Sequence, residues 1–290
     1  MNILTKRRRA FILKINSIFF VLLLIILTPL AQAESDNAKV YTFGIVPQQS
    51  ATRLARLWVP VLNYLGGKSG IDLRFKTAPN IPTFEKRLAA GEYDLAYMNP
   101  YHYTLFHQSP GYVAFAHAAN KQIKGILVVR KDSPIQDLEA LAGQTLAFPA
   151  PAAFAASMLP RAQLSKLGIA IQPNYVSSHD SVYRGVVKGI YPAGGGVMRT
   201  LLSVAPEIRD QLRVLWTTEG YTPHAFAAHP AVPIGVVDRL QQAMLNMKND
   251  SEGLQLLKNL SMEGFTFAHD SEWDDVRGLG TQLLDQLINP

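Results

Sequence analysis

The fold is decided by the stretch KQIKGILVVRKDSPI at residues 121–135. Its centre, Gly125–Arg130, is a short and strongly apolar run, and a short apolar run bounded by turn-forming residues is typical of a buried strand. This strand opens a second series of alternating strands and helices, because a first series has already run from residue 40 to residue 98. We therefore predict an α/β protein in which a second α/β unit is inserted into the first.

Hydrophobic periodicity predicts the elements on both sides of this stretch. Upstream, strands are predicted at 40–46, 73–77 and 94–98, and helices at 53–65 and 82–90, with Pro82 at a favoured first helical position and Gly91 as a left-handed cap. Downstream, helices are predicted at 138–142, 152–167 and 179–188, and strands at 144–148, 172–177 and 213–216.

The C-terminal part of the chain is predicted to return to the first unit. Helices are expected at 233–247, 252–260 and 272–287, and their apolar faces have few strands of their own segment to cover. The resulting fold class is α/β and two-lobed, with two α/β domains joined by two hinge crossings. Lobe 1 would comprise residues 34–123 and 223–290, and lobe 2 residues 124–222, with a ligand cleft between them.

The N-terminus has the features of an export signal. Five basic residues precede an apolar run from Ile18 to Leu27, and the run ends before a small-residue pattern at Ala31 and Ala33. The run is shorter than the roughly 20 residues of a membrane span, so we predict a signal peptide over residues 1–33, cleaved before Glu34, in preference to an uncleaved anchor. The protein would then be periplasmic.

Composition narrows the possible partners. The whole chain has a net charge of +6, but the five basic residues of the leader account for most of it, and the remainder is close to neutral. Such a balance gives no support for nucleic-acid binding. There are no cysteines, which excludes disulfides, thiolate metal sites and lipid attachment at an N-terminal cysteine. The sequence predicts a freely diffusing monomer.

Four segments, in order, carry a family resemblance. They are FGIVPQQSATRLARLWVPVLNY at 43–64, GEYDLAYMNPYHY at 91–103, GILVVRKDSPI at 125–135 and LAGQTLAFPAP at 141–151. The chain resembles periplasmic solute-binding proteins of the phosphate, phosphite and phosphonate ABC-transporter family, which have the type II two-lobed fold. The resemblance implies that a small anion is captured between the lobes and handed to a membrane permease, without chemistry.

The chain departs from this family at two positions of the implied site. The family has a hydroxyl-rich helix start after the strand that resembles 145–148, whereas this chain has PAAFAAS at 151–157. Backbone N–H groups at a helix start still favour an anion. The family also commonly has an aspartate where this chain has Pro192. The glycines at 194–196 are interpreted as a turn, although they also permit close backbone approach.

The retained candidates for ligand binding come from both predicted lobes. They are Gln48, Tyr97, Asn99, Tyr101, Ala152, Ala153, Phe154 and His179. His179 matches a position where the family has a ligand-contacting histidine, with a helix cap or a surface residue as the alternatives. Tyr101 is either a cleft-facing ring or ordinary packing, and Phe154 either lines an apolar pocket or belongs to the core.

Enzyme chemistry finds little support. The catalytic motifs G-x-S-x-G and H-E-x-x-H and a glycine-rich phosphate loop are absent from the sequence. The histidines are dispersed, so no metal or cofactor is predicted. The acidic residues at 270–275 are interpreted as a solvated helix start, since the spacing of a calcium loop is absent.

The sequence is compatible with three functions. The first is a binding protein of an ABC transporter, the second a periplasmic sensory subunit that docks on a membrane kinase or nucleotide cyclase, and the third a hydrolase that uses the same cleft. The first is favoured. The third is the least supported, because the sequence lacks a catalytic motif.

Overall fold

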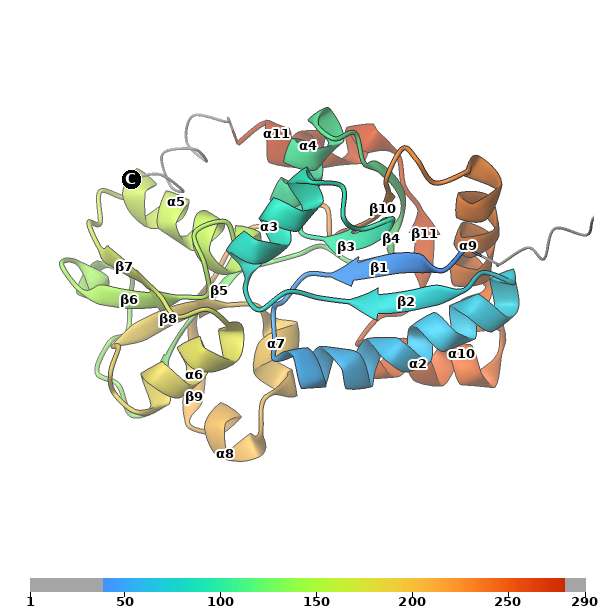
Figure 1. The fold of residues 1–290 in the computed structure, drawn as a ribbon. Helices are drawn as coiled ribbons and strands as arrows, with labels where there is room; N and C mark the ends of the chain where they lie inside the picture. Colours follow the sequence, from blue (N-terminus) through green and yellow to red (C-terminus); the bar gives the residue numbers. More distant parts are fainter. Residues whose placement is uncertain (1–38, 280–290) are drawn as a thin grey trace, which may run out of the picture. The chain divides into compact units, whose positions relative to one another are not determined.

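The computed structural model describes residues 39–279 and contains two mixed β-sheets, each with helices packed against it (Figure 1). We call the part built on the six-stranded sheet lobe 1 and the part built on the five-stranded sheet lobe 2. The predicted signal at 1–33 and the end of the predicted helix 272–287 lie outside the described residues.

The sheet of lobe 1 combines strands from both ends of the chain. Its order is β11-β4-β10-β3-β1-β2. The strands are β1 (Tyr41–Ile45), β2 (Leu73–Lys76), β3 (Leu95–Met98), β4 (Val113–Ala118), β10 (Ala225–Ala228) and β11 (Phe265–Phe267). β1 pairs in parallel with β2 and β3, whereas β10 is antiparallel to β3 and β4. The chain therefore returns to its first sheet after completing the second, as predicted.

Two groups of helices pack in lobe 1 (Figure 1). One group comprises α2 (Ala51–Ser69), α9 (Ile234–Asn246) and α10 (Ser251–Asn259), and the other α3 (Ile81–Ala89), α4 (Pro100–Gln108) and α11 (Asp274–Arg277). The apolar residues that predicted α2, including Leu54, Trp58 and Leu62, are buried. Hydrophobic periodicity thus located the helix, and burial of that face against the lobe core stabilises it.

The sheet of lobe 2 has the order β7-β6-β8-β5-β9. Its strands are β5 (Ile126–Arg130), β6 (Thr145–Phe148), β7 (Gln172–Tyr175), β8 (Ala193–Gly196) and β9 (Leu212–Thr217). The first four of the five residues of β5 are apolar because both faces of the strand are covered: Ile126 and Val128 enter one hydrophobic cluster, whereas Leu127 and Val129 enter another. This two-sided burial explains why β5 has no polar alternation.

The helices of lobe 2 cover both faces of its sheet. They are α5 (Leu159–Lys166), α6 (His179–Val187), α7 (Met198–Ser203) and α8 (Pro206–Arg209), together with a 3-10 turn at Glu139–Leu141 and a π-helical turn at Phe154–Met158. Val182 and Val186 of α6 pack on one side of β5 and Leu164 of α5 on the other.

The two lobes are connected by paired segments. One follows β4 and the other follows β9, and they pair through Ile123 and Tyr221, whose backbone groups exchange hydrogen bonds of 2.8 and 3.0 Å. Further along, the amide of Thr218 donates to the carbonyl of Gly125 at 2.9 Å. The hinge is therefore a short antiparallel ribbon rather than two independent linkers.

The glycines at 194–196 form strand β8, so their interpretation as a turn is wrong. A Cβ at Gly195 would lie 1.9 Å from the carbonyl oxygen of Ala156, and one at Gly125 would lie 1.9 Å from that of Ala155. The residues are glycines because the π-helical turn comes too close to β8 and to the start of β5 for any side chain.

Other differences concern the kind or the length of an element. The predicted helix 152–167 begins as the π-helical turn at Phe154, and the predicted helix 138–142 is the 3-10 turn. β10 and β11 were not predicted, and they supply strands that the C-terminal helices lacked.

Candidate functional site

Gln48, in the loop after β1, contacts residues of both lobes. Its side-chain oxygen accepts a hydrogen bond from the guanidinium of Arg199, and its amide nitrogen donates to Nε2 of His224 at 3.2 Å. Its backbone oxygen accepts from the amide of His179 at 3.3 Å. The neighbouring Gln49 donates to Ser203 Oγ at 2.6 Å. The first loop of lobe 1 is thus held against lobe 2.

Two neighbouring cavities share Gln48, Ile123, Val197 and His224 as bordering residues. The first, which we call the hinge cavity, has a volume of about 200 Å³. It is bordered by Gln48, Tyr97, Ala118, Lys121, Gln122, Ile123, Lys124, Val197, Met198, Arg199, Pro223, His224 and Met262. The second, which we call the inner cavity, has a volume of about 10 Å³. Since about 10–15 Å³ is the lower limit for one water molecule, the inner cavity has no room for a phosphonate in this conformation.

Five of the predicted site residues border the inner cavity: Gln48, Asn99, Ala153, Phe154 and His179. Gln48 and Tyr97 border the hinge cavity. Ala152 and Tyr101 border neither of these two cavities. The structure therefore brings most of the predicted residues to one place but divides them between two spaces of very different size.

The predicted anion-binding helix start is packed against lobe 1. The π-helical turn begins after Ala153 without a side-chain cap, and Phe154, Ala155 and Ala156 are buried in the same hydrophobic cluster as β1 and β3. The Phe154 ring meets Tyr221 edge to face at 5.6 Å. The apolar sequence of this segment is therefore accounted for by a contact between the lobes.

Asn99 connects α4 to the same segment. It is the N-cap of α4, where its Oδ1 accepts from the amide of His102 at 2.8 Å, and its Nδ2 donates to the carbonyl of Ala152 at 3.0 Å. Tyr101 lies in the first turn of this helix and is buried. His102, Tyr103 and His107 are in α4, as expected.

His179 is the first residue of α6 and is 1% exposed. Ser178, and not His179, caps the helix, since the Ser178 side chain accepts from the amide of Ser181. The His179 ring lies 3.0 Å from Thr200 Oγ1. Burial, and then the positive charge of Arg199, lower the pKa of His179 to about 3. The ring is therefore neutral at physiological pH.

His224 and Tyr97 form an aromatic wall of the hinge cavity. Their rings stack at 4.9 Å, and Trp58 packs behind Tyr97 at 4.9 Å. Burial and the charge of Arg199 are the leading causes that lower the pKa of His224 well below its usual value. A neutral His224 agrees with its geometry, because its Nε2 accepts the hydrogen bond from Gln48.

Arg199, Lys121 and His224 were not selected from the sequence. They come from α7 and from the two connecting segments, so nothing in their local sequence indicates that they meet. The charge of Arg199 contributes to the lowered pKa of His179, His224 and Lys121. The site is therefore electrostatically positive, a property that only the folded chain reveals.

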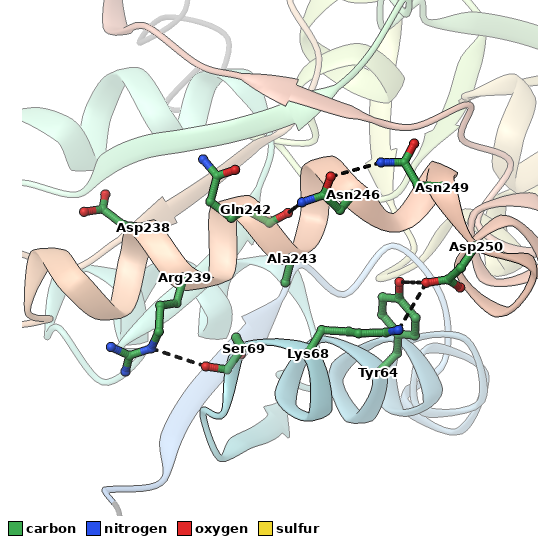
Figure 2. Close-up of a pocket in the computed structure, with 10 residues that line it drawn as sticks. All are labelled: Tyr64, Lys68, Ser69, Asp238, Arg239, Gln242, Ala243, Asn246, Asn249 and Asp250. Carbon is green, nitrogen blue, oxygen red and sulfur yellow. Dashed lines mark hydrogen bonds and ion pairs between the residues drawn. The ribbon is translucent and has the colours of Figure 1, made fainter.

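A separate hollow of about 550 Å³ lies between α2 and α9 (Figure 2). Three of its charged groups have partners: Lys68 lies 3.3 Å from Asp250, which also accepts from Tyr64 OH at 2.6 Å, and Arg239 donates to the carbonyl of Ser69 at 3.2 Å. These contacts join the two helices, so the hollow is explained by helix packing.

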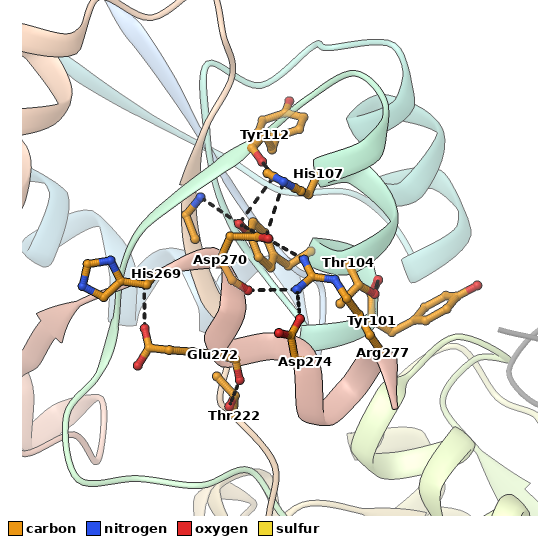
Figure 3. A network of polar contacts seen from close by, with 12 residues as sticks. Tyr101, Thr104, His107, Tyr112, Thr222, His269, Asp270, Glu272, Asp274 and Arg277 are labelled. Atoms are coloured by element: carbon orange, nitrogen blue, oxygen red, sulfur yellow. Dashed lines mark hydrogen bonds and ion pairs between the residues drawn. The ribbon is translucent and has the colours of Figure 1, made fainter. Parts of the chain in front are cut away.

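The acidic residues at 270–275 form a network of polar contacts around Arg277 (Figure 3). Arg277 contacts Asp270 and Asp274, each at 2.6 Å, and Tyr103 OH donates to Asp270 at 2.8 Å. Arg277 offsets part of the negative charge of Asp270 and Asp274, and the Tyr103–Asp270 hydrogen bond fastens the C-terminal helical turns to α4. Within residues 39–279 no group of three or more potential metal ligands converges.

Across the described part of the chain, none of the helices has both the length and the apolar composition needed to span a membrane.

Comparison with known proteins identifies relatives of this fold. "Phosphate-import protein PhnD" of Mycolicibacterium smegmatis is 22% identical over 82% of this chain and 79% of its own length. A binding protein component of an ABC phosphonate transporter from Pseudomonas aeruginosa has a TM-score of 0.78 at 17% identity, covering 87% of this chain and 88% of the other. PhnD1 of Prochlorococcus marinus, solved with methylphosphonate, has a TM-score of 0.76 at 18% identity, covering 85% and 99%.

These structures confirm the predicted two-lobed, type II periplasmic binding fold. The family model for the periplasmic substrate-binding protein of phosphonate ABC transporters matches residues 43–273, which is most of the chain. The family consists of binding proteins rather than enzymes, in agreement with the missing catalytic motifs. With the sheet order, the hinge ribbon and the interlobe site in place, this match shows that the chain belongs to the phosphonate-binding family of periplasmic ABC-transporter proteins.

Proposed function

We propose that this chain captures a small oxyanion, of the phosphonate or phosphate kind, between its lobes and delivers it to the permease of an ABC transporter. The observation that carries the proposal is the convergence of polar groups from both lobes on Gln48, through Arg199, His179 and His224. A ligand that contacts both lobes stabilises the closed form by those contacts, and its release allows opening.

The relatives support this class of ligand. One is named for phosphate import, and another was solved with methylphosphonate. The described residues around Gln48 supply amide, imidazole, phenol and guanidinium groups, which suit an oxyanion. We propose Gln48 and Tyr97, which border the hinge cavity, as ligand contacts, with Asn99, His179, Ala152, Ala153, Phe154 and Tyr101 shaping the site behind them.

The test is a calorimetric and thermal-shift screen of the mature protein. Phosphate, phosphite, methylphosphonate and ethylphosphonate should bind and raise Tm, whereas neutral sugars and arginine should not. Small-angle scattering should show a smaller radius of gyration when the ligand is added. If none of the oxyanions binds or changes Tm, the proposal is wrong.

Further parts of the proposal concern the context of the protein. Lobe 1 is proposed to comprise residues 34–123 and 223–290, and lobe 2 residues 124–222. The exported form is proposed to begin at Glu34 and to be a monomer in the periplasm. Mass spectrometry of protein purified from the periplasm tests the cleavage site, and light scattering tests the monomer. Genes for an ATPase and a permease beside this gene would support transport, whereas a sensor kinase or cyclase gene would oppose it.

A further inference from the structure

We propose that the oxyanion is held in the hinge cavity by Arg199 and Lys121, and that this cavity selects anions without an amino group. The inference rests on the proposed function, because it says which residues and which class of oxyanion that function involves. It differs from the expectation that the helix start at 152–156 holds the anion.

Space is the first reason for this location. The hinge cavity has a volume of about 200 Å³, whereas the inner cavity beside the helix start has about 10 Å³. The inner cavity is bordered by residues of both lobes, such as Asn99 and His179, so a phosphonate could fit there only if the lobes moved apart. The hinge cavity needs no such movement.

Charge is the second reason. Arg199, Lys121 and Lys124 border the hinge cavity, and none of its bordering residues within the described chain is acidic. Arg199 is half-buried and lowers the pKa of its neighbours His179, His224 and Lys121. Glu263 is the acidic group that acts on Lys121, but it does not border the cavity. A bound anion would offset the repulsion between Arg199 and Lys121.

Geometry is the third reason. Gln48 accepts from Arg199 and donates to His224, so one amide holds the guanidinium beside the aromatic wall made by His224 and Tyr97. A guanidinium can bind two oxygens of a phosphonate at once. The ligand would bring its oxyanion to Arg199 and lay its carbon substituent on the Tyr97 side of the cavity.

The preference for anions without an amino group follows from the residues that border the hinge cavity. An ammonium group on the ligand would be placed among Arg199, Lys121 and Lys124 with no carboxylate on the cavity wall to receive it. Alkylphosphonates and phosphonocarboxylates should therefore bind better than aminoalkylphosphonates.

The first arm of the experiment compares matched ligands by calorimetry. Ethylphosphonate and phosphonoacetate should each bind at least tenfold more tightly than 2-aminoethylphosphonate. If 2-aminoethylphosphonate binds as tightly as ethylphosphonate, the inference about selectivity is overturned, while the proposed function stands. If neither phosphate nor any phosphonate binds, it is the proposed function that fails.

The second arm tests the residues. Arg199→Gln and Lys121→Gln should each weaken ethylphosphonate binding at least tenfold, whereas Arg56→Gln, on the exposed surface of α2, should leave it unchanged. Equal affinity in Arg199→Gln and the wild type would overturn the location in the hinge cavity. Loss of binding in Ala153→Asp with full binding in Arg199→Gln would place the anion at the helix start instead.

A third measurement separates binding from folding. Without ligand, Arg199→Gln should melt close to the wild type, because the weakened hydrogen bond to Gln48 is offset by removal of a charge that repels Lys121. With ethylphosphonate, its Tm should not rise. A large loss of Tm without ligand would mean that Arg199 is a structural residue, and this result would contradict the inference.

Discussion

At the scale of the residue, His179 shows how a polar side chain is held neutral inside the protein. It has 1% of its surface exposed, bonds to Thr200, and faces the charge of Arg199. The family resemblance suggested a ligand contact, and the alternatives were a cap or a surface residue. The structure shows a buried ring beside the inner cavity, so its protonation state is coupled to folding.

We expect stability to fall as the pH falls below the unfolded-state pKa of His179. The folded pKa is about 3 and the reference value is 6.5, so between these values the unfolded chain binds a proton that the folded chain does not. The loss from this group between pH 7 and pH 5 is about 2 kcal/mol. Urea denaturation at both pH values should show a smaller pH effect in His179→Asn than in the wild type.

The matched control for this prediction is His269→Asn, since His269 is exposed. It should keep the pH effect of the wild type. An equally large pH effect in His179→Asn would show that His179 is not responsible. His224 has its own pKa lowered and should account for part of the remaining pH dependence.

At the scale of the element, the contact of β8 with the π-helical turn depends on glycine. The Cβ of Gly195→Ala would lie 1.9 Å from the carbonyl oxygen of Ala156 and 2.7 Å from the Phe148 ring. Both neighbours are buried, so we expect the free energy of unfolding to fall by about 1–3 kcal/mol or more. In contrast, Gly67→Ala in α2 has nothing within 4 Å and should raise it by about 0.5–1 kcal/mol. Chemical denaturation of both variants checks the pair, and a neutral Gly195→Ala would contradict the close contact.

The side chain of Asn99 caps α4 and also donates to the carbonyl of Ala152, and the second hydrogen bond can be removed without the first. Asn99→Asp keeps the acceptor that caps α4, but it replaces the donor to the carbonyl of Ala152 with an oxygen. We expect a loss of about 1–3 kcal/mol in the free energy of unfolding, measured by urea denaturation.

Asn80→Asp is the control for Asn99→Asp, because Asn80 caps α3 through its Oδ1, with a hydrogen bond of 2.9 Å from the amide of Thr83. Aspartate is as good an N-cap as asparagine, so this variant should be nearly neutral. Equal stabilities of the two variants would argue against the link to Ala152.

The sequence predicts these elements unevenly, for physical reasons. β5 and α2 can be predicted from the sequence because their buried residues form a clear apolar pattern. β8 was missed because its glycines have a low strand propensity and are required by close neighbours, the π-helical turn at Gly195 and α6 at Gly194 and Gly196. β10 was missed since a short alanine-rich segment becomes a strand only between two partners, β3 and β4.

The same reasoning applies to the candidate site. Gln48, Asn99 and His179 could be selected because family motifs surround them, and the structure places all three at the inner cavity. Arg199, Lys121 and His224 lie far apart in the sequence, and only the topology brings them to the hinge cavity. The positive charge of Arg199 and Lys121 is also not apparent from the net charge of the chain, because acidic residues elsewhere balance it.

At the scale of the whole molecule, contacts between the lobes set how readily the protein closes. Gln49 donates to Ser203 at 2.6 Å across the lobes and borders neither the hinge cavity nor the inner cavity. We expect Gln49→Ala to destabilise the closed form by about 0.5–1.5 kcal/mol and to weaken binding of a phosphonate about two- to tenfold. Calorimetry should detect this change although no ligand contact is altered.

A double-mutant cycle provides the control for this interlobe contact. Ser203→Ala should weaken binding as much as Gln49→Ala, and the double variant should be no weaker than either single variant. Additive losses would mean that the two residues act through different contacts.

The hinge ribbon, with Ile123 paired to Tyr221, has one more consequence. Lys121 lies two residues before Ile123, and Arg199 borders the same cavity as Ile123, so two positive groups lie beside the hinge ribbon. Near an axis of rotation a displacement of a fraction of an ångström corresponds to a much larger displacement at the far ends of the lobes. Neutralising a few charges at the hinge would then change the distance between the far ends of the two lobes. A membrane partner that contacts both lobes can sense this change.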